Sequence, residues 1–192
     1  CSGYVLGLSL AHDLIKAGRY KNILLLAGDT ISKTITPQDR STAMIFGDAG
    51  TATLIAATED NAHVHFIIGS VSSGIDSLKI ENGLFREPQK IGTDGDYLYM
   101  DGAAVFSFAL KFIPKLIADL AGLSGQTAQD FDHVLMHQAN GFMLRHIAKK
   151  AKLDSACVPI NIGKFGNTSS ATVPLLLCNE VNLTVPQHYA LL

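Results

Sequence analysis

The chain has 192 residues, of which 47% are hydrophobic and 17% are charged. This composition excludes a disordered protein, a collagen-like fibre and a charged coiled coil. The formal net charge of −2 argues against a nucleic-acid-binding protein. No apolar run approaches the roughly 18 residues of a membrane-spanning helix, and three scattered cysteines predict neither a disulfide framework nor a zinc site. We therefore expect a cytoplasmic globular protein that binds no metal, nucleic acid or membrane.

The first part of the chain predicts a helix followed by strands. Residues 4–17 are apolar on almost every side and precede Gly18, a pattern typical of a buried helix that ends at a glycine. Residues 23–28 form a continuous apolar run, which indicates a strand buried on both faces. Further strands are expected at 51–57 and 64–68.

The remaining chain predicts alternating loops, helices and strands. Residues 70–96 are rich in Gly, Ser, Asp and Asn, which indicates a long functional loop. Asp101 is a candidate N-cap for a helix from Gly102 to about Leu120, and Pro114 should kink or divide that helix. A short strand at 134–136, helices at 140–152 and 169–182 and a strand starting at 189 complete the predicted elements. This alternation predicts an α/β layered fold with a central sheet.

Three polar residues stand at the ends of predicted buried elements. Cys1 begins the first helix, where free N–H groups and the helix dipole favour a thiolate. His137 ends an apolar strand, and Asn167 follows a turn before a helix. Together a thiol, an imidazole and an amide suggest covalent thioester chemistry with donors for a developing oxyanion. Taken singly, each residue has a structural interpretation, as a packing cysteine, a structural histidine and a turn or cap residue.

An ordered set of motifs is more specific than these single residues. The chain contains Cys1-Ser2-Gly3, Asp39-Arg40-Ser41-Thr42, Phe46-Gly47-Asp48-Ala49-Gly50, Met100-Asp101-Gly102, His137-Gln138-Ala139-Asn140 and Gly166-Asn167-Thr168-Ser169-Ser170. In this order they resemble the β-ketoacyl-acyl carrier protein synthase III family of the thiolase superfamily. The resemblance implies a homodimer with a thiolase-like layered αβαβα fold, of which this chain is an incomplete part. It assigns 1–60 to the end of the N-terminal half, 61–96 to a connecting and tunnel region, and 97–192 to a truncated C-terminal half.

The resemblance also implies an acyltransferase reaction. Cys1 would take an acyl group from acyl-coenzyme A, and malonyl-acyl carrier protein would then lose carbon dioxide and attack the acyl-Cys1 thioester. His137 and Asn167 would hydrogen-bond the thioester oxygen as negative charge builds there. The acyl-coenzyme A site would include Arg40, Asn140 and Gly102, with no cofactor beyond the two thioester substrates. Asn140 is equally suited to be a helix N-cap.

A basic helix face would dock the acidic carrier protein through Arg145, Lys149 and Lys150, opposite an apolar stripe at Leu144, Ile147, Ala148 and Ala151. The arginine that the family commonly carries just after the Asn140 position is absent, because Gly141 and Phe142 stand there. Arg145, one turn further on, would substitute for it. A merely solvated helix face is the alternative.

Other functions remain open from the sequence. One is a related condensing enzyme of polyketide or secondary metabolism. Another is a hydrolase in which the α-amine of Cys1 is the base, a mechanism that needs neither His137 nor Asn167. A non-catalytic relative is the third, although the intact Cys1, His137 and Asn167 count against it. Because the family's first third would precede Cys1 and a glycine-rich strand would follow the C-terminus, we expect the 192 residues alone to be inactive and poorly folded.

Overall fold

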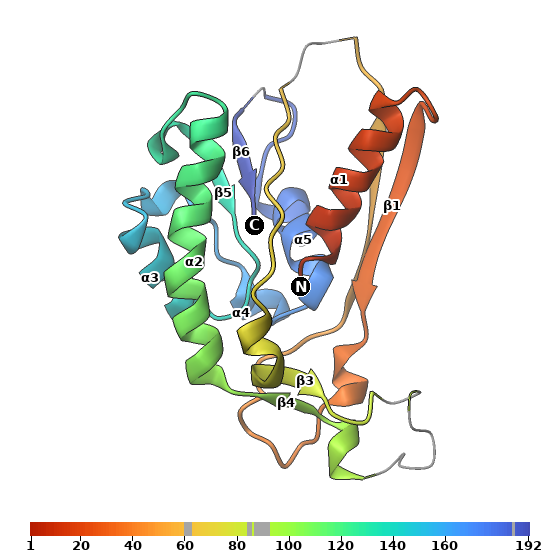
Figure 1. The fold of residues 1–192 in the computed structure, drawn as a ribbon, viewed down its shortest axis with the longest axis vertical. Helices are drawn as coiled ribbons and strands as arrows, with labels where there is room; N and C mark the ends of the chain where they lie inside the picture. The colour runs from red at the N-terminus through yellow and green to blue at the C-terminus, as the bar shows by residue number, and fades with distance from the viewer. Residues whose placement is uncertain (60–62, 84–85, 87–92, 186) are drawn as a thin grey trace.

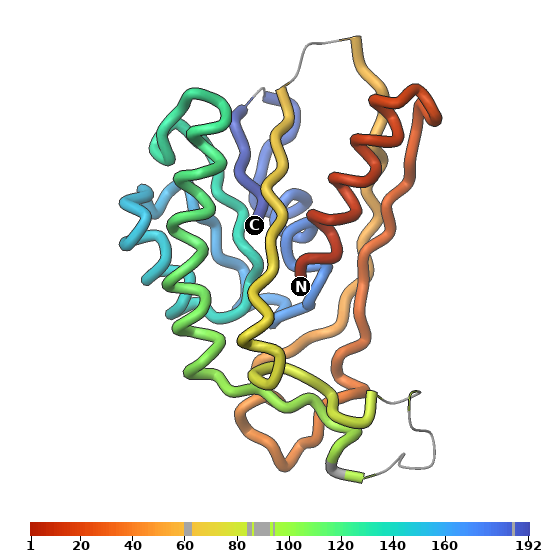
Figure 2. Tube along the Cα trace, viewed as in Figure 1, coloured from red at the N-terminus to blue at the C-terminus, as the bar shows by residue number. Residues whose placement is uncertain are grey.

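The computed structural model describes residues 1–59, 63–83, 86, 93–185 and 187–192, and its path is drawn in Figure 1 and Figure 2. In chain order the elements are α1 (Gly3–Lys16), β1 (Asn22–Asp29), η1 (Ile31–Thr34), β2 (Ala49–Ala56), η2 (Ser72–Ser77), β3 (Leu78–Ile80), η4 (Asp94–Asp96), β4 (Leu98–Met100), α2 (Gly102–Leu123), η5 (Ala128–Asp130), β5 (His133–Leu135), α3 (Gly141–Lys150), η6 (Ser155–Cys157), α4 (Ile162–Phe165), η7 (Ser169–Ala171), α5 (Thr172–Glu180) and β6 (Tyr189–Leu191), where η denotes a short 3-10 helix.

The strands of the described residues form three two-stranded sheets. β1 and β2 are antiparallel from the pair Asn22 and Ala56 to the pair Asp29 and Ala49. β3 pairs with β4 in antiparallel fashion, whereas β5 and β6 are parallel. The prediction of one central sheet is therefore wrong for the described part of the chain, because helices separate the sheets from one another.

The helices and two of these sheets alternate in layers. Figure 1 shows α2 and α3 on one side, then β5 and β6, then α1 and α5, and finally β1 with its partner strand. The burial of β5 agrees with this order. Val134 packs in a hydrophobic cluster formed mainly by α2 and α3, whereas the next residue, Leu135, packs with Tyr4 of α1 and Leu176 of α5. Successive strand side chains point to opposite faces, so β5 lies between two helical layers, and the layered α/β prediction is confirmed.

Burial of α1 and β1 is less complete than the sequence predicts. Leu25 of β1 lies against α1, but Leu24 and Leu26 on the other face are 60% and 69% exposed. Within α1, Tyr4 and Ala11 are buried, whereas Leu10 is 61% exposed. The predictions of a strand buried on both faces and of a helix buried all round are wrong here, because the described residues cover only one side of each element.

Several predicted boundaries also change. α2 continues through Pro114 as one helix, so the expected division is wrong, and the core positions Ile117 and Ala121 beyond the proline are completely buried.

Residues 63–71 form no strand, because they have no ladder partner in the described part of the chain. The predicted loop at 70–96 contains β3 and short 3-10 turns, and its residues 84–85 and 87–92 lie outside the described residues. The helix expected from residue 169 begins as η7 and becomes α-helical at Thr172. The Asp101 cap is confirmed, since its side chain accepts a hydrogen bond from the Ala104 N–H at 2.9 Å.

Gly47 offers a test of a close backbone approach in this fold. A Cβ at this position would lie 2.2 Å from the carbonyl oxygen of Phe165. We expect Gly47→Ala to lower the free energy of unfolding of the full-length gene product by about 2 kcal/mol, because backbone must move to admit the methyl group. Gly50→Ala is the matched control, since a Cβ there meets nothing within 4 Å. Denaturant unfolding measures both variants, and equal losses would contradict the proposed clash.

Candidate active site

Residues 167–172, here called the site loop, connect the short helix α4 to α5 and are anchored by backbone hydrogen bonds to a distant segment. The N–H of Asn167 donates to the carbonyl of Ile45 at 2.8 Å, and the N–H of Gly47 donates to the carbonyl of Asn167 at 3.0 Å. These bonds form a parallel bridge between Phe46 and Asn167. The chain enters the loop through Gly166, whose φ of +70° favours glycine.

The two polar atoms of the Asn167 side chain differ, because its oxygen is hydrogen-bonded within the loop and its nitrogen is not. The residue is 5% exposed, and its Oδ1 accepts a hydrogen bond from the Ser169 N–H at 3.0 Å. Its Nδ2 has no hydrogen-bond partner among the described residues, and it is not among their fully buried unsatisfied atoms. Ser169 adopts a left-handed φ of +54°, a conformation that is rare for serine and needs support from its surroundings. The geometry therefore leaves the amide Nδ2 as a fixed donor that a ligand can reach.

His137 approaches the site loop from the end of β5. Its backbone N–H donates to the carbonyl of Leu192 at 2.7 Å, and its ring Nδ1 lies 2.7 Å from Oγ1 of Thr172. Burial is the main reason that the pKa of His137 falls to about 4, and the carbonyl of Ser169 acts in the opposite direction. The imidazole is consequently neutral at pH 7, and Nε2 is its remaining nitrogen.

Cys1 reaches the same loop from the start of α1. The residue is exposed, and the helix behind it packs on the loop, since a Cβ on Gly3 would lie 3.5 Å from the Cβ of Ser170. Figure 1 also shows the N-terminus beside α5. The structure therefore brings Cys1, His137 and Asn167 from three separate parts of the chain to one loop.

Asp29 is a site-loop contact that the sequence analysis missed. Its Oδ2 accepts hydrogen bonds from the backbone N–H of Ser170 at 3.0 Å and from its hydroxyl at 2.6 Å. The hydroxyl bond is the main reason that the pKa of Asp29 lies below its usual range. Thr172 was also missed. The sequence offered a signal for each residue. Asp29 is a charged residue at the end of an apolar strand, and Thr172 is a hydroxyl residue in the motif that follows Asn167.

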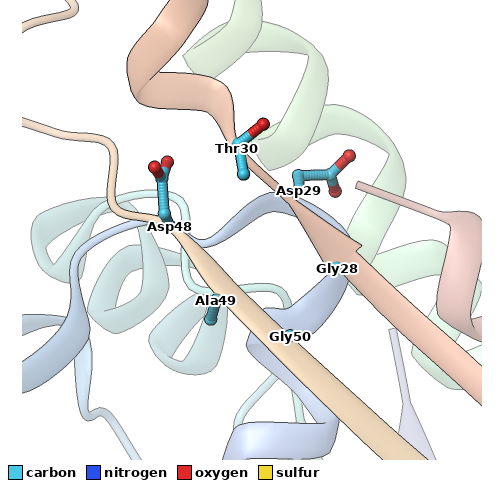
Figure 3. Close-up of a pocket in the computed structure, with 6 residues that line it drawn as sticks. All are labelled: Gly28, Asp29, Thr30, Asp48, Ala49 and Gly50. Atoms are coloured by element: carbon cyan, nitrogen blue, oxygen red, sulfur yellow. The ribbon is translucent and has the colours of Figure 1, made fainter.

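A pocket of about 440 Å³ lies next to this site rather than in it. Figure 3 shows its lining at the end of β1 and the start of β2, formed by Gly28, Asp29, Thr30, Asp48, Ala49 and Gly50. Asp48 is held by Ser32, whose backbone N–H donates to it at 2.9 Å. Asp29 links the pocket to the site loop through its hydrogen bonds to Ser170. Over the described ranges, His, Cys, Asp and Glu side chains form no group of three able to hold a metal ion.

Among the described residues, no hydrogen bond links the predicted acyl-coenzyme A residues to the site loop. Arg40 is exposed in a turn, and in the described part of the chain no hydrogen bond or ion pair joins it to Cys1, His137 or Asn167. Gly102 opens α2, and a Cβ there would meet nothing within 4 Å. Asn140 caps α3, because its Oδ1 accepts hydrogen bonds from the backbone N–H groups of the next helical turn at 2.8 and 3.3 Å. The cap interpretation of Asn140 is confirmed.

The predicted basic face of α3 is exposed, and its apolar stripe is buried at Leu144, Ile147 and Ala148. Arg145 and Lys149 extend from the surface, whereas Lys150 Nζ donates to the carbonyl of Leu110 on α2 at 2.8 Å. Phe142, in the first turn of α3, is 57% exposed. Its ring lies 4.1 Å from that of His146 and 5.9 Å from that of Phe106.

None of the helices within the described residues combines the length and apolar character needed to cross a bilayer.

The neutral state of His137 can be tested by NMR titration of the full-length gene product. Because burial disfavours the imidazolium, the ring should stay neutral as the pH falls from 7 to 5 and take up a proton only near pH 4. Between pH 6.5 and about 4 the unfolded chain binds this proton more strongly than the folded chain does, so the free energy of unfolding should fall as the pH falls. His137→Asn identifies the signal and should remove this part of the pH dependence. Titration of His137 near pH 6.5 would contradict the prediction.

The chain is similar to known proteins in both sequence and fold. Models of 3-oxoacyl-[acyl-carrier-protein] synthase III and of its C-terminal part match residues 1–72 and 123–188. A β-ketoacyl-[acyl-carrier-protein] synthase III of Streptococcus sanguinis is 38% identical over 188 residues, which are 95% of this chain and 57% of the relative. The crystal structure of a 3-oxoacyl-(acyl-carrier protein) synthase from Burkholderia xenovorans has 43% identity and a TM-score of 0.86, covering 94% of this chain and 54% of that one. A further crystal structure of a synthase III has 35% identity and a TM-score of 0.90, covering 100% and 61%.

The chain thus spans little more than half the length of the relatives that it matches. Its mixed α/β architecture is the corresponding part of their thiolase-like fold. By its matched motifs, its sequence identity and its fold, the chain belongs to the β-ketoacyl-acyl carrier protein synthase III family.

Proposed function

We propose that the full-length gene product condenses an acyl-coenzyme A primer with malonyl-acyl carrier protein to give a β-ketoacyl product. The observation that carries this proposal is the meeting of Cys1, His137 and Asn167 at the site loop in a chain of this family. A hydrolase that uses the α-amine of Cys1 as its base would need neither His137 nor Asn167. The family assignment argues against that alternative.

The first half-reaction is acyl transfer to Cys1. The sulfur attacks the thioester carbonyl of acyl-coenzyme A, so that a new carbon–sulfur bond forms and coenzyme A leaves. The exposure of Cys1 supports access by a large thioester. Its place before the first turn of α1 favours negative charge on the sulfur, because the free N–H groups of a helix start carry partial positive charge.

The second half-reaction is decarboxylation and carbon–carbon bond formation. Malonyl-acyl carrier protein loses carbon dioxide, and the electron pair of the broken bond moves into an enolate at the thioester oxygen. Nδ2 of Asn167 and an N–H at Nε2 of His137 are the proposed donors to that oxygen. The enolate carbon then attacks the acyl-Cys1 carbonyl, and the carbon–sulfur bond breaks to release Cys1. Each donor that such an oxyanion loses costs about 3 kcal/mol of barrier.

Variants at Cys1 and Asn167 separate the two half-reactions. We expect Cys1→Ala to form no acyl adduct with acyl-coenzyme A, as read by intact mass. Asn167→Asp keeps an oxygen for the Ser169 N–H but removes the Nδ2 donor. It should therefore acylate normally yet decarboxylate malonyl thioester about 100-fold more slowly. An acylated Cys1→Ala protein, or an Asn167→Asp protein that decarboxylates at the unchanged rate, would overturn the proposed roles.

The carrier protein is proposed to dock on the exposed face of α3. Arg145 and Lys149 are free to meet acidic residues, whereas Lys150 is anchored to the carbonyl of Leu110 and contributes a fixed charge. The face follows His137 closely in the chain, since Asn140 caps α3 and only three residues lie between His137 and the first helical residue, Gly141. Positive charge there steers an acidic partner toward the site.

Charge reversal tests this docking face. We expect the double variant Arg145→Glu and Lys149→Glu to raise the KM for malonyl-acyl carrier protein about tenfold, because like charges repel an acidic partner. The KM for acyl-coenzyme A should not change. Lys16→Glu with Lys21→Glu, on exposed residues at the end of α1 and just before β1, is the matched control for net charge. If both double variants change both KM values equally, docking at α3 is rejected.

The remaining expectations are carried by the family resemblance. We propose that the protein acts as a homodimer in the cytoplasm, that its primer site includes Arg40 and Gly102, and that its two thiolase-like halves meet between residues 60 and 97. Open space around Gly102 supports its place beside a ligand. Asn140 is proposed to act on the primer site through the helix start that it caps.

A further inference from the structure

The hydroxyl of Thr172 lies between two groups that compete for its single proton. Its Oγ1 is 2.7 Å from Nδ1 of His137 and 3.0 Å from the carbonyl oxygen of Ser169. Thr172 is 2% exposed, so water has almost no access to complete its hydrogen bonding. A hydroxyl can donate one hydrogen bond and accept two. The hydrogen bonds of Thr172 therefore show which atom carries each proton at this site.

The carbonyl of Ser169 determines whether Nδ1 of His137 carries a proton. A carbonyl oxygen only accepts hydrogen bonds, so Thr172 must donate its proton to Ser169 if that contact is a hydrogen bond. Oγ1 then offers only a lone pair to His137, and Nδ1 of the ring must carry a proton.

The Ser169 carbonyl is fixed in this direction by the loop itself. Ser169 has a left-handed φ of +54°, and its N–H is held by Oδ1 of Asn167. The following residue, Ser170, is fixed by Asp29. Turning the Ser169 carbonyl away from Thr172 would require these bonds to break, so the acceptor stays in place.

We infer that Thr172 is a positioning residue that holds neutral His137 as the tautomer protonated at Nδ1, leaving Nε2 free to accept the thiol proton of Cys1. The catalytic part of this inference, proton transfer from Cys1, rests on the proposed function. The proton moves from Sγ to Nε2, which leaves a thiolate and an imidazolium that still donates its Nδ1–H to Thr172. Coenzyme A departs as a thiolate and takes a proton from solvent. The new Nε2–H then donates to the malonyl thioester oxygen, and its proton returns to Sγ when condensation releases Cys1.

Ring ¹⁵N shifts of histidine-labelled full-length protein test the tautomer without any measurement of activity. At pH 7 the His137 signals, identified by their loss in His137→Asn, should show a protonated Nδ1 and an unprotonated Nε2. Thr172→Val should shift the ring toward the Nε2–H form that a free side chain prefers, and Thr172→Ser should restore the original form. An Nε2–H tautomer in the unmodified protein overturns the inference, whether or not the valine variant folds.

Thr168→Val is the matched control for the loss of a threonine hydroxyl. Thr168 belongs to the same loop and is 1% exposed, but its Oγ1 has no hydrogen-bond partner among the described residues. This control should leave the His137 tautomer unchanged. If it alters the tautomer as strongly as Thr172→Val does, loop disturbance rather than the Thr172 hydroxyl is the cause, and the inference fails.

The rate of Cys1 acylation by acyl-coenzyme A supplies the second readout. Thr172→Val should acylate at least about tenfold more slowly, whereas Thr172→Ser and Thr168→Val should acylate at the normal rate. An unchanged rate in a Thr172→Val protein whose tautomer has shifted overturns the base role of Nε2. If the tautomers behave as stated but the unmodified protein forms no acyl adduct, the proposed function fails while the tautomer assignment stands.

Discussion

The carboxylate of Asp29 joins the end of β1 to a loop 141 residues further along the chain, and the geometry of the site depends on this contact. Both bonds go to Ser170, one to its backbone N–H and one to its hydroxyl. They keep the carboxylate ionised, because each stabilises its negative charge. Ser170 in turn lies against Gly3 at the start of α1. One ionised group therefore sets the distance between the helix that carries Cys1 and the loop that carries Asn167.

Around this anchor, the site loop holds side chains by hydrogen bonds rather than by packing alone. The side-chain oxygen of Asn167 accepts a hydrogen bond from the Ser169 N–H, which leaves the side-chain NH₂ group to face a ligand. The hydroxyl of Thr172, which donates to the carbonyl of Ser169, occupies one nitrogen of His137 and leaves the other for chemistry. The left-handed conformation of Ser169 costs on the order of 1 kcal/mol, and these bonds offset that cost. Burial keeps the imidazole neutral in the resting protein.

Features that depend on short stretches of sequence were predicted from it, and features that depend on distant partners were not. Asp101 and Asn140 were recognised as caps because a cap needs only the next helical turn. Cys1, His137 and Asn167 are distant in sequence, and they were selected instead through the family resemblance of their motifs. The exposed face of β1 and the missing strand at 64–68 escaped prediction, because burial and strand pairing are decided by whatever segment lies alongside. Asp29 and Thr172 were missed for the same reason, since their importance lies in contacts with residues far from them in sequence or on another element.

The parallel bridge between Phe46 and Asn167 has a consequence for how this sequence can vary. The Asn167 backbone is bound on both sides, through its N–H and its carbonyl, to the peptide groups that flank Phe46. Its position is thus dictated by main-chain atoms, which every amino acid shares. Exchanges of side chain at Phe46 or Ile45 leave those atoms unchanged, but insertion or deletion of a single residue there shifts the register and displaces the amide. Homologous chains should accordingly tolerate changes of residue type in this segment far better than changes of its length.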